Sequence, residues 1–387
     1  MNPRNLFLSL FLGSIIGSLT YAFFYWIQLA QNYRNQYPQL VLAMPIILIL
    51  TFLTIKKTFY FPKKVIELYE AQEQRPLFWN RFTSAYQLLG AGFSHLVGAS
   101  VGREGAVVVM ATGLSTAFKL NLQYWAPVLA AAGFATAVGK PFIAVLFIIE
   151  MYRTHFTQKL WSLVIAWVAV LSVETLNLYF TPDASFIHLL PKLTIESSTS
   201  IWNRLFFVIA VGVLMGLISK FYKIIYEKLN TYFKFSKIKV LPVVMSLFVA
   251  VFLFQNNFQY LQSLSFDLIG QHLNFNVDIN QVFLKLLITL ICVSLGFFGG
   301  EFVPLVVVGT GYGLWFSQMT GEHPTFGILL GSFGIFCGIT RFKWTAIALA
   351  LSLSGVGYFF WIFICYSLCI NFCGENSIYS PNTTDQN

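Results

Sequence analysis

Long apolar runs separated by short polar stretches dominate the chain and predict transmembrane helices. Such runs cover residues 6–30, 40–55, 160–176, 205–221 and 240–254. We expect each run to cross a lipid bilayer as a helix, because the membrane interior offers no water to unpaired backbone groups. The pattern therefore predicts an all-α polytopic membrane protein.

Apolar runs that are interrupted in the middle are the second feature of the pattern. Residues 127–137 and 142–151 are separated by Gly139-Lys140-Pro141, and residues 88–118 are interrupted by Gly102-Arg103-Glu104-Gly105. Broken helices are tolerated at membrane depth where they line a cavity or are covered by protein. We therefore expect these breaks to lie at a functional site or beneath other helices.

A weak internal repeat suggests that the chain has two related halves. A glycine-flanked glutamate occurs in each half, at Glu104 and at Glu301, and a GFAT stretch after the first resembles a GIT stretch after the second. Interrupted helices in both halves of a membrane protein indicate a midplane site between inverted repeats. We predict one inverted half in residues 1–199 and the other in residues 200–387.

Composition and charge narrow the class of protein. The chain is 57% hydrophobic and 10% charged, with a mean hydropathy of +0.70, which excludes a water-soluble domain. The net charge of +9 lies in short loops and not on one face, so we expect no nucleic-acid partner. Six lysines between residues 220 and 239, together with the basic loop after residue 55, place both termini in the cytoplasm. We expect a plasma (inner) membrane location, with the lipid bilayer as a partner.

The polar tetrapeptide Gly102-Arg103-Glu104-Gly105 is the strongest candidate for chemistry. Charged side chains inside an apolar run are costly unless they face protein, water or an ion. A helix that starts at Gly105 would direct free backbone N–H groups and a partial positive charge towards an anion. The alternative is a buried Arg103–Glu104 pair that only joins two membrane helices.

The same tetrapeptide lies in a run that resembles a known family. GASVGREGAVV, residues 98–108, is similar to the GxxGREGP segment of the CLC family of chloride channels and chloride/proton antiporters. The resemblance implies that Glu104 is the external gate and that Gly102, Arg103, Gly105 and Ala106 bind the anion. It also implies a homodimer with one pathway in each subunit. Many members carry cytosolic CBS domains, and we expect none here because only a short tail follows the last apolar run.

A second segment, GGEFVP at residues 299–304, is similar to the family's GGIFxP segment. The resemblance implies that the backbone N–H groups of Phe302 and Val303 bind the anion, and Pro304 suits the first turn of a helix. Glu301 replaces the usual isoleucine, as in the fluoride-transporting branch, whereas Val303 stands where that branch has threonine. We predict Glu301 either as a proton group or as a carboxylate in an aqueous vestibule.

A third segment, GENSIYS at residues 374–380, resembles the family's C-terminal segment and is nearest to its fluoride branch. In the family this segment provides the central tyrosine, whose phenol donates a hydrogen bond to the anion. The resemblance implies that Tyr379 is this ligand. The alternative is an aromatic side chain at the membrane interface.

Other positions depart from the family pattern. The GSGIP segment is not recognisable at residues 59–63, where Tyr60 is the stand-in anion ligand. Met151 occupies the position of the antiporters' proton-transfer glutamate and cannot relay a proton. Three cations lie in helix breaks: Lys140, Arg341 and Lys343. They either raise the local anion concentration or reach an interface by snorkelling.

These observations predict CLC-type transport of a small inorganic anion, gated by Glu104. Chloride is the family default, with or without coupled protons. The alternatives are a fluoride/proton antiporter and a degenerate family member with a structural role. An intramembrane enzyme is disfavoured, because the five histidines form no i, i+4 pair and neither GxSxG nor HExxH occurs. We therefore expect no enzymatic activity, no cofactor and no metal ion.

Overall fold

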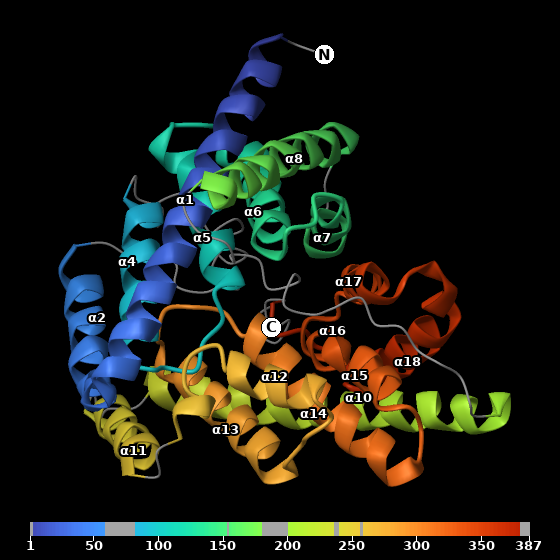
Figure 1. The fold of residues 1–387 in the computed structure, drawn as a ribbon. Helices are drawn as coiled ribbons and strands as arrows, with labels where there is room; N and C mark the ends of the chain where they lie inside the picture. The colour runs from blue at the N-terminus through green and yellow to red at the C-terminus, as the bar shows by residue number, and fades with distance from the viewer. Residues whose placement is uncertain are drawn as a thin grey trace. The chain divides into compact units, whose positions relative to one another are not determined.

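The computed structural model describes residues 3–58, 82–152, 155–179, 200–235, 240–255 and 258–379. Within these ranges every named element is a helix (Figure 1). One isolated β-bridge joins Gly102 to Gly300. The prediction of an all-α protein is confirmed. Tyr60 lies outside the described residues.

The chain divides into two compact units. The first comprises Met1–Leu189 with Gly296–Gly300, and the second comprises Leu190–Leu295 with Glu301–Asn387. Each unit has its own buried helices and is described separately below. The inverted relationship between residues 1–199 and residues 200–387 stays a prediction.

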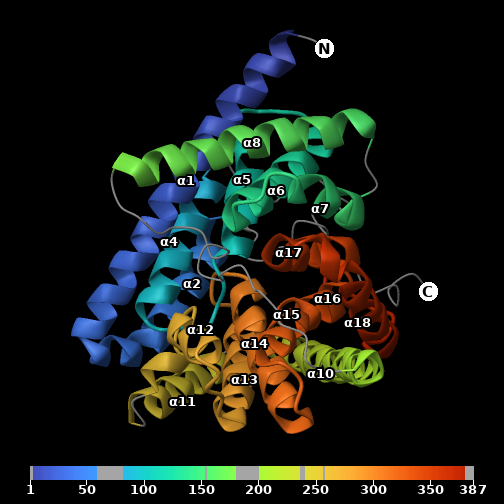
Figure 2. The ribbon, with the colours of Figure 1, turned by 45° about the vertical axis from the view of Figure 1, so that its right-hand side comes forward.

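The first unit has two buried helices between longer ones. α5 (Glu104–Ala117) and α6 (Leu122–Val138) pack against each other, and nearly all of their residues are buried. α1 (Pro3–Gln36) packs against α4 (Thr83–Leu96) and α8 (Phe156–Tyr179) (Figure 2). Helices that are apolar on every side, such as α5 and α6, are stable only when they are covered on every side.

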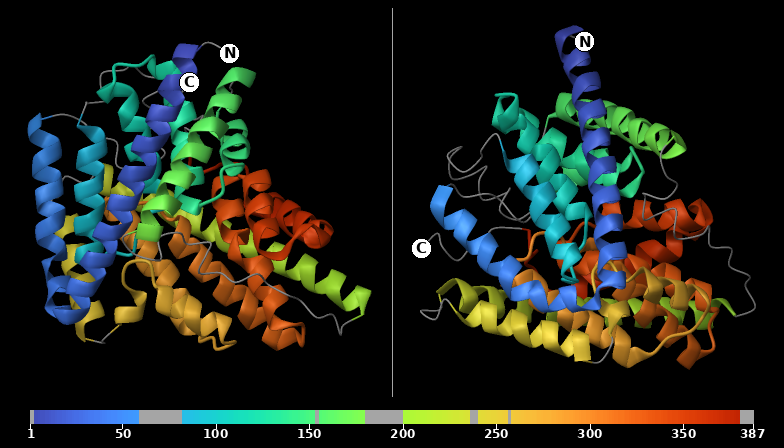
Figure 3. Two further views of the ribbon diagram at one scale, coloured as in Figure 1. Left: turned by 45° about the horizontal axis from the view of Figure 1, so that its top comes forward. Right: turned by 60° about the vertical axis from the view of Figure 1, so that its left-hand side comes forward.

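Small residues allow the long helices of this unit to approach closely. A Cβ atom at Gly17 of α1 would lie 2.5 Å from the Ala169 carbonyl oxygen of α8. Glycine at such positions is typical of membrane helices, which gain stability from close packing. α4 also runs beside α2 (Met44–Thr58) (Figure 3). The remaining elements of the unit are η1 (Pro38–Ala43) and α7 (Ile143–Met151).

The second unit is organised around α14 (Phe302–Thr320), which packs against α15 (Pro324–Ser332) and α16 (Gly334–Thr340). A Cβ atom at Gly313 would lie 2.0 Å from the Gly327 carbonyl oxygen, so α14 and α15 cross at backbone distance. The other elements are α10 (Ile201–Phe235), α11 (Leu241–Gln255), η3 (Gln259–Leu261), α12 (Phe266–Leu273), α13 (Ile279–Leu295), α17 (Lys343–Ser354), η4 (Val356–Tyr358) and α18 (Phe359–Phe372). α10 packs against both α16 and α18.

Four helices in the described residues are long and apolar enough to cross a membrane: Pro3–Gln36, Phe156–Tyr179, Ile201–Phe233 and Phe302–Thr320. Three of them contain runs for which the sequence predicts a crossing. The chain is an integral, multi-pass membrane protein. The fourth, α14, runs unbroken for 19 residues although its sequence contains several glycines.

Two of the predicted spans form helices of about the expected length, which are short for a membrane crossing. The runs at residues 40–55 and 240–254 form α2 and α11, each of which has 15 residues. At about 1.5 Å per residue such a helix is roughly 22 Å long, less than the roughly 30 Å of a membrane core. In the first case Pro38 begins a separate 3₁₀ turn that takes up the start of the run.

The predicted break after α6 is confirmed. α6 ends at Val138, Gly139 has a φ of 70°, and α7 begins at Ile143. A positive φ suits glycine and ends the helix there. The short apolar pieces on either side are therefore separate helices.

Candidate functional site

Paired glycines hold the loop before α5. Gly102 and Gly300 exchange two backbone hydrogen bonds, and the bond from Gly300 N to Gly102 O is 2.7 Å long. A Cβ atom at Gly300 would lie 2.9 Å from the Gly105 Cα atom. Gly299 has a φ of 144°, which disfavours any side chain. The glycines of both motifs are therefore needed for this close backbone approach.

α5 begins at Glu104, one residue before the predicted start. Its first turn closes with a hydrogen bond from Val107 N to Arg103 O. The backbone N–H groups of Glu104, Gly105 and Ala106 come before that bond and have no partner within the helix. Together with the helix dipole they form a weakly positive end, which can bind an anion or a carboxylate.

Glu104 and Arg103 form a buried ion pair at this helix end. Arg103 Nε lies 3.3 Å from Glu104 Oε1, and the Glu104 side chain is 0% exposed. The Arg103 guanidinium also lies 3.9 Å from the centroid of the Phe24 ring, which is a cation–π contact. Glu104 Oε2 makes no hydrogen bond to any of the described residues. The pair therefore leaves one carboxylate oxygen available to another partner.

Sequence analysis missed the residues that support this loop. Arg34 is buried, and its Nη1 donates to the His95 carbonyl oxygen over 2.5 Å. Ser94 Oγ accepts a hydrogen bond of 3.1 Å from the backbone N–H of Phe298. Arg34 had a usable signal, because it is the one cation between the first two apolar runs. Ser94 had none.

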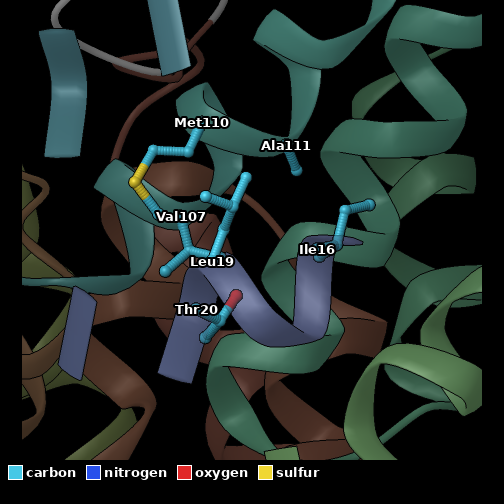
Figure 4. Close-up of a pocket in the computed structure, with 6 residues that line it drawn as sticks. All are labelled: Ile16, Leu19, Thr20, Val107, Met110 and Ala111. Carbon is cyan, nitrogen blue, oxygen red and sulfur yellow. The ribbon is translucent and has the colours of Figure 1, made fainter. Parts of the chain in front are cut away.

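Other candidate ligand sites in the described part of the chain are weak. A narrow pocket lies between α1 and α5, lined by Ile16, Leu19, Thr20, Val107, Met110 and Ala111 (Figure 4). It has no space for a water molecule, and an anion would find only one hydroxyl there. The described residues also contain no cluster of three or more His, Cys, Asp or Glu side chains that could hold a metal ion.

The second glutamate stands immediately before α14. The helix begins at Phe302, and its first turn closes with a bond of 2.9 Å from Leu305 N to Glu301 O. Phe302 and Val303 are buried at the first two helical positions, where their N–H groups have no partner within the helix. Pro304 lies in the first turn, as predicted, and has no N–H to satisfy.

Tyr379 contacts this glutamate. Its hydroxyl donates a hydrogen bond to the Glu301 carboxylate, and the tyrosine is only 9% exposed. The centroid of its ring lies 5.8 Å from that of Phe342. Tyr379 is therefore buried beside Glu301.

Two cations hold the backbone before Tyr379. Lys223 Nζ donates to the Asn376 carbonyl oxygen over 2.6 Å, and Arg341 Nη1 donates to the Gly374 carbonyl oxygen over 2.5 Å. Arg341 has a φ of 64°, an uncommon conformation for a residue with a side chain. One of the cations noted in the helix breaks is thus bound to backbone.

The other two cations of the helix breaks behave differently. Lys343 Nζ lies 4.0 Å from the centroid of the Phe363 ring, which is a cation–π contact. Lys140 is half-buried immediately after α6. Neither side chain is fully exposed. Lys343 contacts an aromatic ring, whereas Arg341 donates a hydrogen bond to a backbone carbonyl.

A second tyrosine lies close to Glu301, and sequence reasoning missed it. Tyr222 of α10 is fully buried. It is near enough to interact electrostatically with Glu301 and with Tyr379. Its hydroxyl makes no hydrogen bond to any described residue. Nothing in the local sequence of α10 distinguishes Tyr222 from the other aromatic residues of this chain.

The family model for voltage-gated chloride channels matches residues 61–373. The chain belongs to this family. It is 26% identical over 291 residues to a chloride/fluoride channel protein of Pseudomonas syringae pv. tomato, a match that covers 69% of this chain and 61% of that protein. It is 24% identical over 311 residues to the H⁺/Cl⁻ exchange transporter ClcA of Yersinia pestis bv. Antiqua, which covers 73% and 63%. The chain thus spans less than two thirds of the length of these curated relatives.

Solved structures of CLC proteins have the same fold. A CLC-type fluoride/proton antiporter matches with a TM-score of 0.82 and 21% identity, over 97% of this chain and 96% of that chain. A slow cyanobacterial Cl⁻/H⁺ antiporter matches with a TM-score of 0.80 and 17% identity, over 98% and 97%. These likenesses establish the CLC fold for this family member.

Proposed function

We propose that this CLC-family protein moves a small inorganic anion across a membrane, with Glu104 as the gate. The observation that supports this most directly is the buried Glu104 carboxylate at the start of α5, with Oε2 unbonded among the described residues. An ionised carboxylate there competes with a free anion for the same N–H groups. Protonation of Glu104, or its displacement by an anion, releases the side chain from this position.

The proposed anion ligands form two sets. The first is the start of α5, with Gly102, Arg103, Gly105 and Ala106. The second is the start of α14, with Phe302, Val303 and Tyr379, whose O–H can turn from Glu301 to an anion when Glu301 is protonated. Both sets rest on buried helix ends, where the first backbone N–H groups have no partner within the helix. Tyr60 stays a prediction from the sequence.

Chloride is the proposed ion, and fluoride is the competing one. The names of the two curated relatives, a chloride/fluoride channel and an H⁺/Cl⁻ exchanger, support a halide. The GGE and GENSIYS motifs favour the fluoride branch. Fluoride is strongly hydrated and needs close donors in place of its water, but Val303 offers only its backbone N–H. We therefore place chloride first.

We further propose a homodimer with one pathway in each subunit, in which residues 1–199 and 200–387 are the inverted halves. Lysines between residues 220 and 239 support a cytoplasmic location for that loop and for both termini. We also propose a plasma (inner) membrane location. We propose no catalytic activity, which agrees with the names of the relatives as a channel and a transporter.

The test is efflux of both ions from liposomes that contain the purified protein, with internal pH recorded at the same time. Chloride efflux without proton movement supports a channel, and chloride efflux with opposite proton movement supports an exchanger. Fluoride efflux much faster than chloride efflux would overturn the choice of chloride. No efflux of either ion would reject transport and leave a structural role as the explanation.

A further inference from the structure

One face of α10 points towards the backbone that precedes Tyr379. Ser219, Tyr222, Lys223 and Tyr226 have the i, i+3, i+4, i+7 spacing of a single helix face, and all four are buried. Lys223 Nζ on this face reaches the Asn376 carbonyl oxygen at 2.6 Å. The same face therefore directs Tyr222 into the protein near this segment.

Tyr222 has a polar group that the proposed mechanism does not use. The residue is 0% exposed, and its hydroxyl has no hydrogen-bond partner among the described residues. Buried hydroxyl groups in native proteins are almost always bonded to protein, to ordered water or to an ion, because leaving them unpaired costs stability. α10 packs against α14, and Glu301 at the start of α14 interacts with Tyr222. The hydroxyl thus lies within electrostatic range of a carboxylate.

We propose that Tyr222 binds a water molecule next to Glu301 and is a further proton-handling residue of this protein; the proposal rests on the proposed transport function. Water fits this place better than a free anion, because the Glu301 carboxylate repels negative charge. Water can accept a hydrogen bond from the phenol and donate one to the carboxylate. Tyr379 already donates one hydrogen bond to that carboxylate.

The proton step uses only O–H bonds. A proton from the aqueous side enters the bound water as the water passes one of its own protons to a Glu301 oxygen, so that no hydroxide forms. Tyr222 orients the water and remains a phenol throughout. Because Met151 stands where antiporters of this family have a proton-transfer carboxylate, protons need another route in this chain.

The test compares Tyr222→Phe with Tyr366→Phe in the full-length protein. Tyr366 is a matched control, because it is also fully buried but its hydroxyl donates to the Leu329 carbonyl oxygen at 3.5 Å. Each variant is measured for thermal unfolding in detergent and for chloride, fluoride and proton flux in the same liposomes. The pH dependence of anion flux is recorded from pH 5 to pH 8, which covers roughly the range in which proton-transferring groups act.

We expect Tyr222→Phe to unfold at the same or a higher temperature than wild type, because it removes an unpaired hydroxyl. Proton flux per anion should fall by about tenfold or more, or the pH dependence of anion flux should shift, since positioned proton-transfer groups contribute about that much. Tyr366→Phe should lose stability and keep both transport properties. A purely structural role would produce the opposite pattern for Tyr222.

The remaining outcomes separate a failure of the role of Tyr222 from a failure of the transport function. In one outcome the wild-type protein carries anions while Tyr222→Phe changes neither the proton flux nor the pH dependence. This result overturns the role of Tyr222 and leaves anion transport in place. The role of Tyr222 is also overturned if the wild-type protein carries anions without proton movement and without pH dependence. Absence of any anion flux from the wild-type protein rejects the transport function itself.

Discussion

Glu104 and Glu301 have similar sequence settings and different structural surroundings. Glycines lie on both sides of Glu104, and two glycines come directly before Glu301. Each glutamate stands at the start of a buried helix. Glu104 is paired with the cation Arg103, and one of its oxygens is unbonded among the described residues. Glu301 accepts a hydrogen bond from the neutral phenol of Tyr379. The partner, and not the motif, therefore distinguishes the two carboxylates.

The two partners suit the two carboxylates to different roles. A guanidinium only donates hydrogen bonds and so pairs with an ionised carboxylate. A phenol can donate to an ionised carboxylate or accept from a protonated one. Glu104 therefore suits a charge that competes with an anion, whereas Glu301 suits a group that gains and loses a proton without losing its neighbour.

The largest expected effect comes from exchanging the two glutamates, one at a time, for glutamine. Glu104→Gln mimics the protonated gate, so it should raise passive anion flux or abolish proton coupling in liposomes. Glu301→Gln should leave the gate in place and change chiefly the pH dependence. Equal effects from both substitutions would remove the distinction drawn here. Unchanged flux and pH dependence in Glu104→Gln would exclude Glu104 as the gate.

Gly300→Ala tests the backbone pairing that supports the first region. The new Cβ atom would lie 2.9 Å from Gly105 Cα, so the loop must shift. We expect a loss of about 1–3 kcal/mol in stability, as for overpacked sites, with reduced anion flux. Thermal unfolding in detergent measures it. The control is Gly357→Ala, because a Cβ atom there meets nothing within 4 Å; equal stability of the two variants would contradict the role of the glycine pair.

Tyr379→Phe tests the phenol of the second region. Removing one hydrogen-bond donor costs about 0.5–1.5 kcal/mol, or up to about 3 when the partner is charged. Anion affinity measured by calorimetry should therefore fall between about twofold and a hundredfold. Tyr366→Phe serves as the control for loss of a buried phenol elsewhere. Unaltered affinity in Tyr379→Phe would leave this tyrosine with a packing role only.

The smallest expected effect is from the cations behind Tyr379. Arg341→Gln removes a contact to the backbone of Gly374 and should weaken anion affinity by about threefold, a coupling typical of residues in one network. If Arg341 acts by positioning Tyr379, its substitution has no further effect in a Tyr379→Phe background. Lys220→Gln is the control, because Lys220 is an exposed cation on α10.

An additive effect of Arg341→Gln would point to a different explanation. Simple attraction of anions by the guanidinium would persist in the Tyr379→Phe background and would weaken as the salt concentration rises. Calorimetric titrations of both variants at low and high ionic strength separate the two cases. A salt-dependent, additive effect would assign Arg341 to the field around the site and not to the tyrosine.

The sequence alone determined features that depend on neighbouring residues. Apolar runs predicted the helices, Gly139 and Pro141 predicted the break after α6, and the charged tetrapeptide predicted a helix start within one residue of Glu104. These signals are local, because helix ends and breaks follow from glycine, proline and charge over a few positions. The crossing of the membrane by 15-residue helices such as α11 stays a prediction, because such a helix is shorter than a membrane core.

Only the tertiary structure decided which distant residues meet. Arg34 binds a carbonyl 61 residues away, and Lys223 binds one 153 residues away. Tyr222 lies in an aromatic-rich helix and becomes notable only because folding buries its unbonded hydroxyl within electrostatic range of Glu301. The local sequence does not indicate the partner in such contacts, because each depends on how separate helices pack around small residues. The motifs therefore identified the two glutamates, and the packing determined their partners.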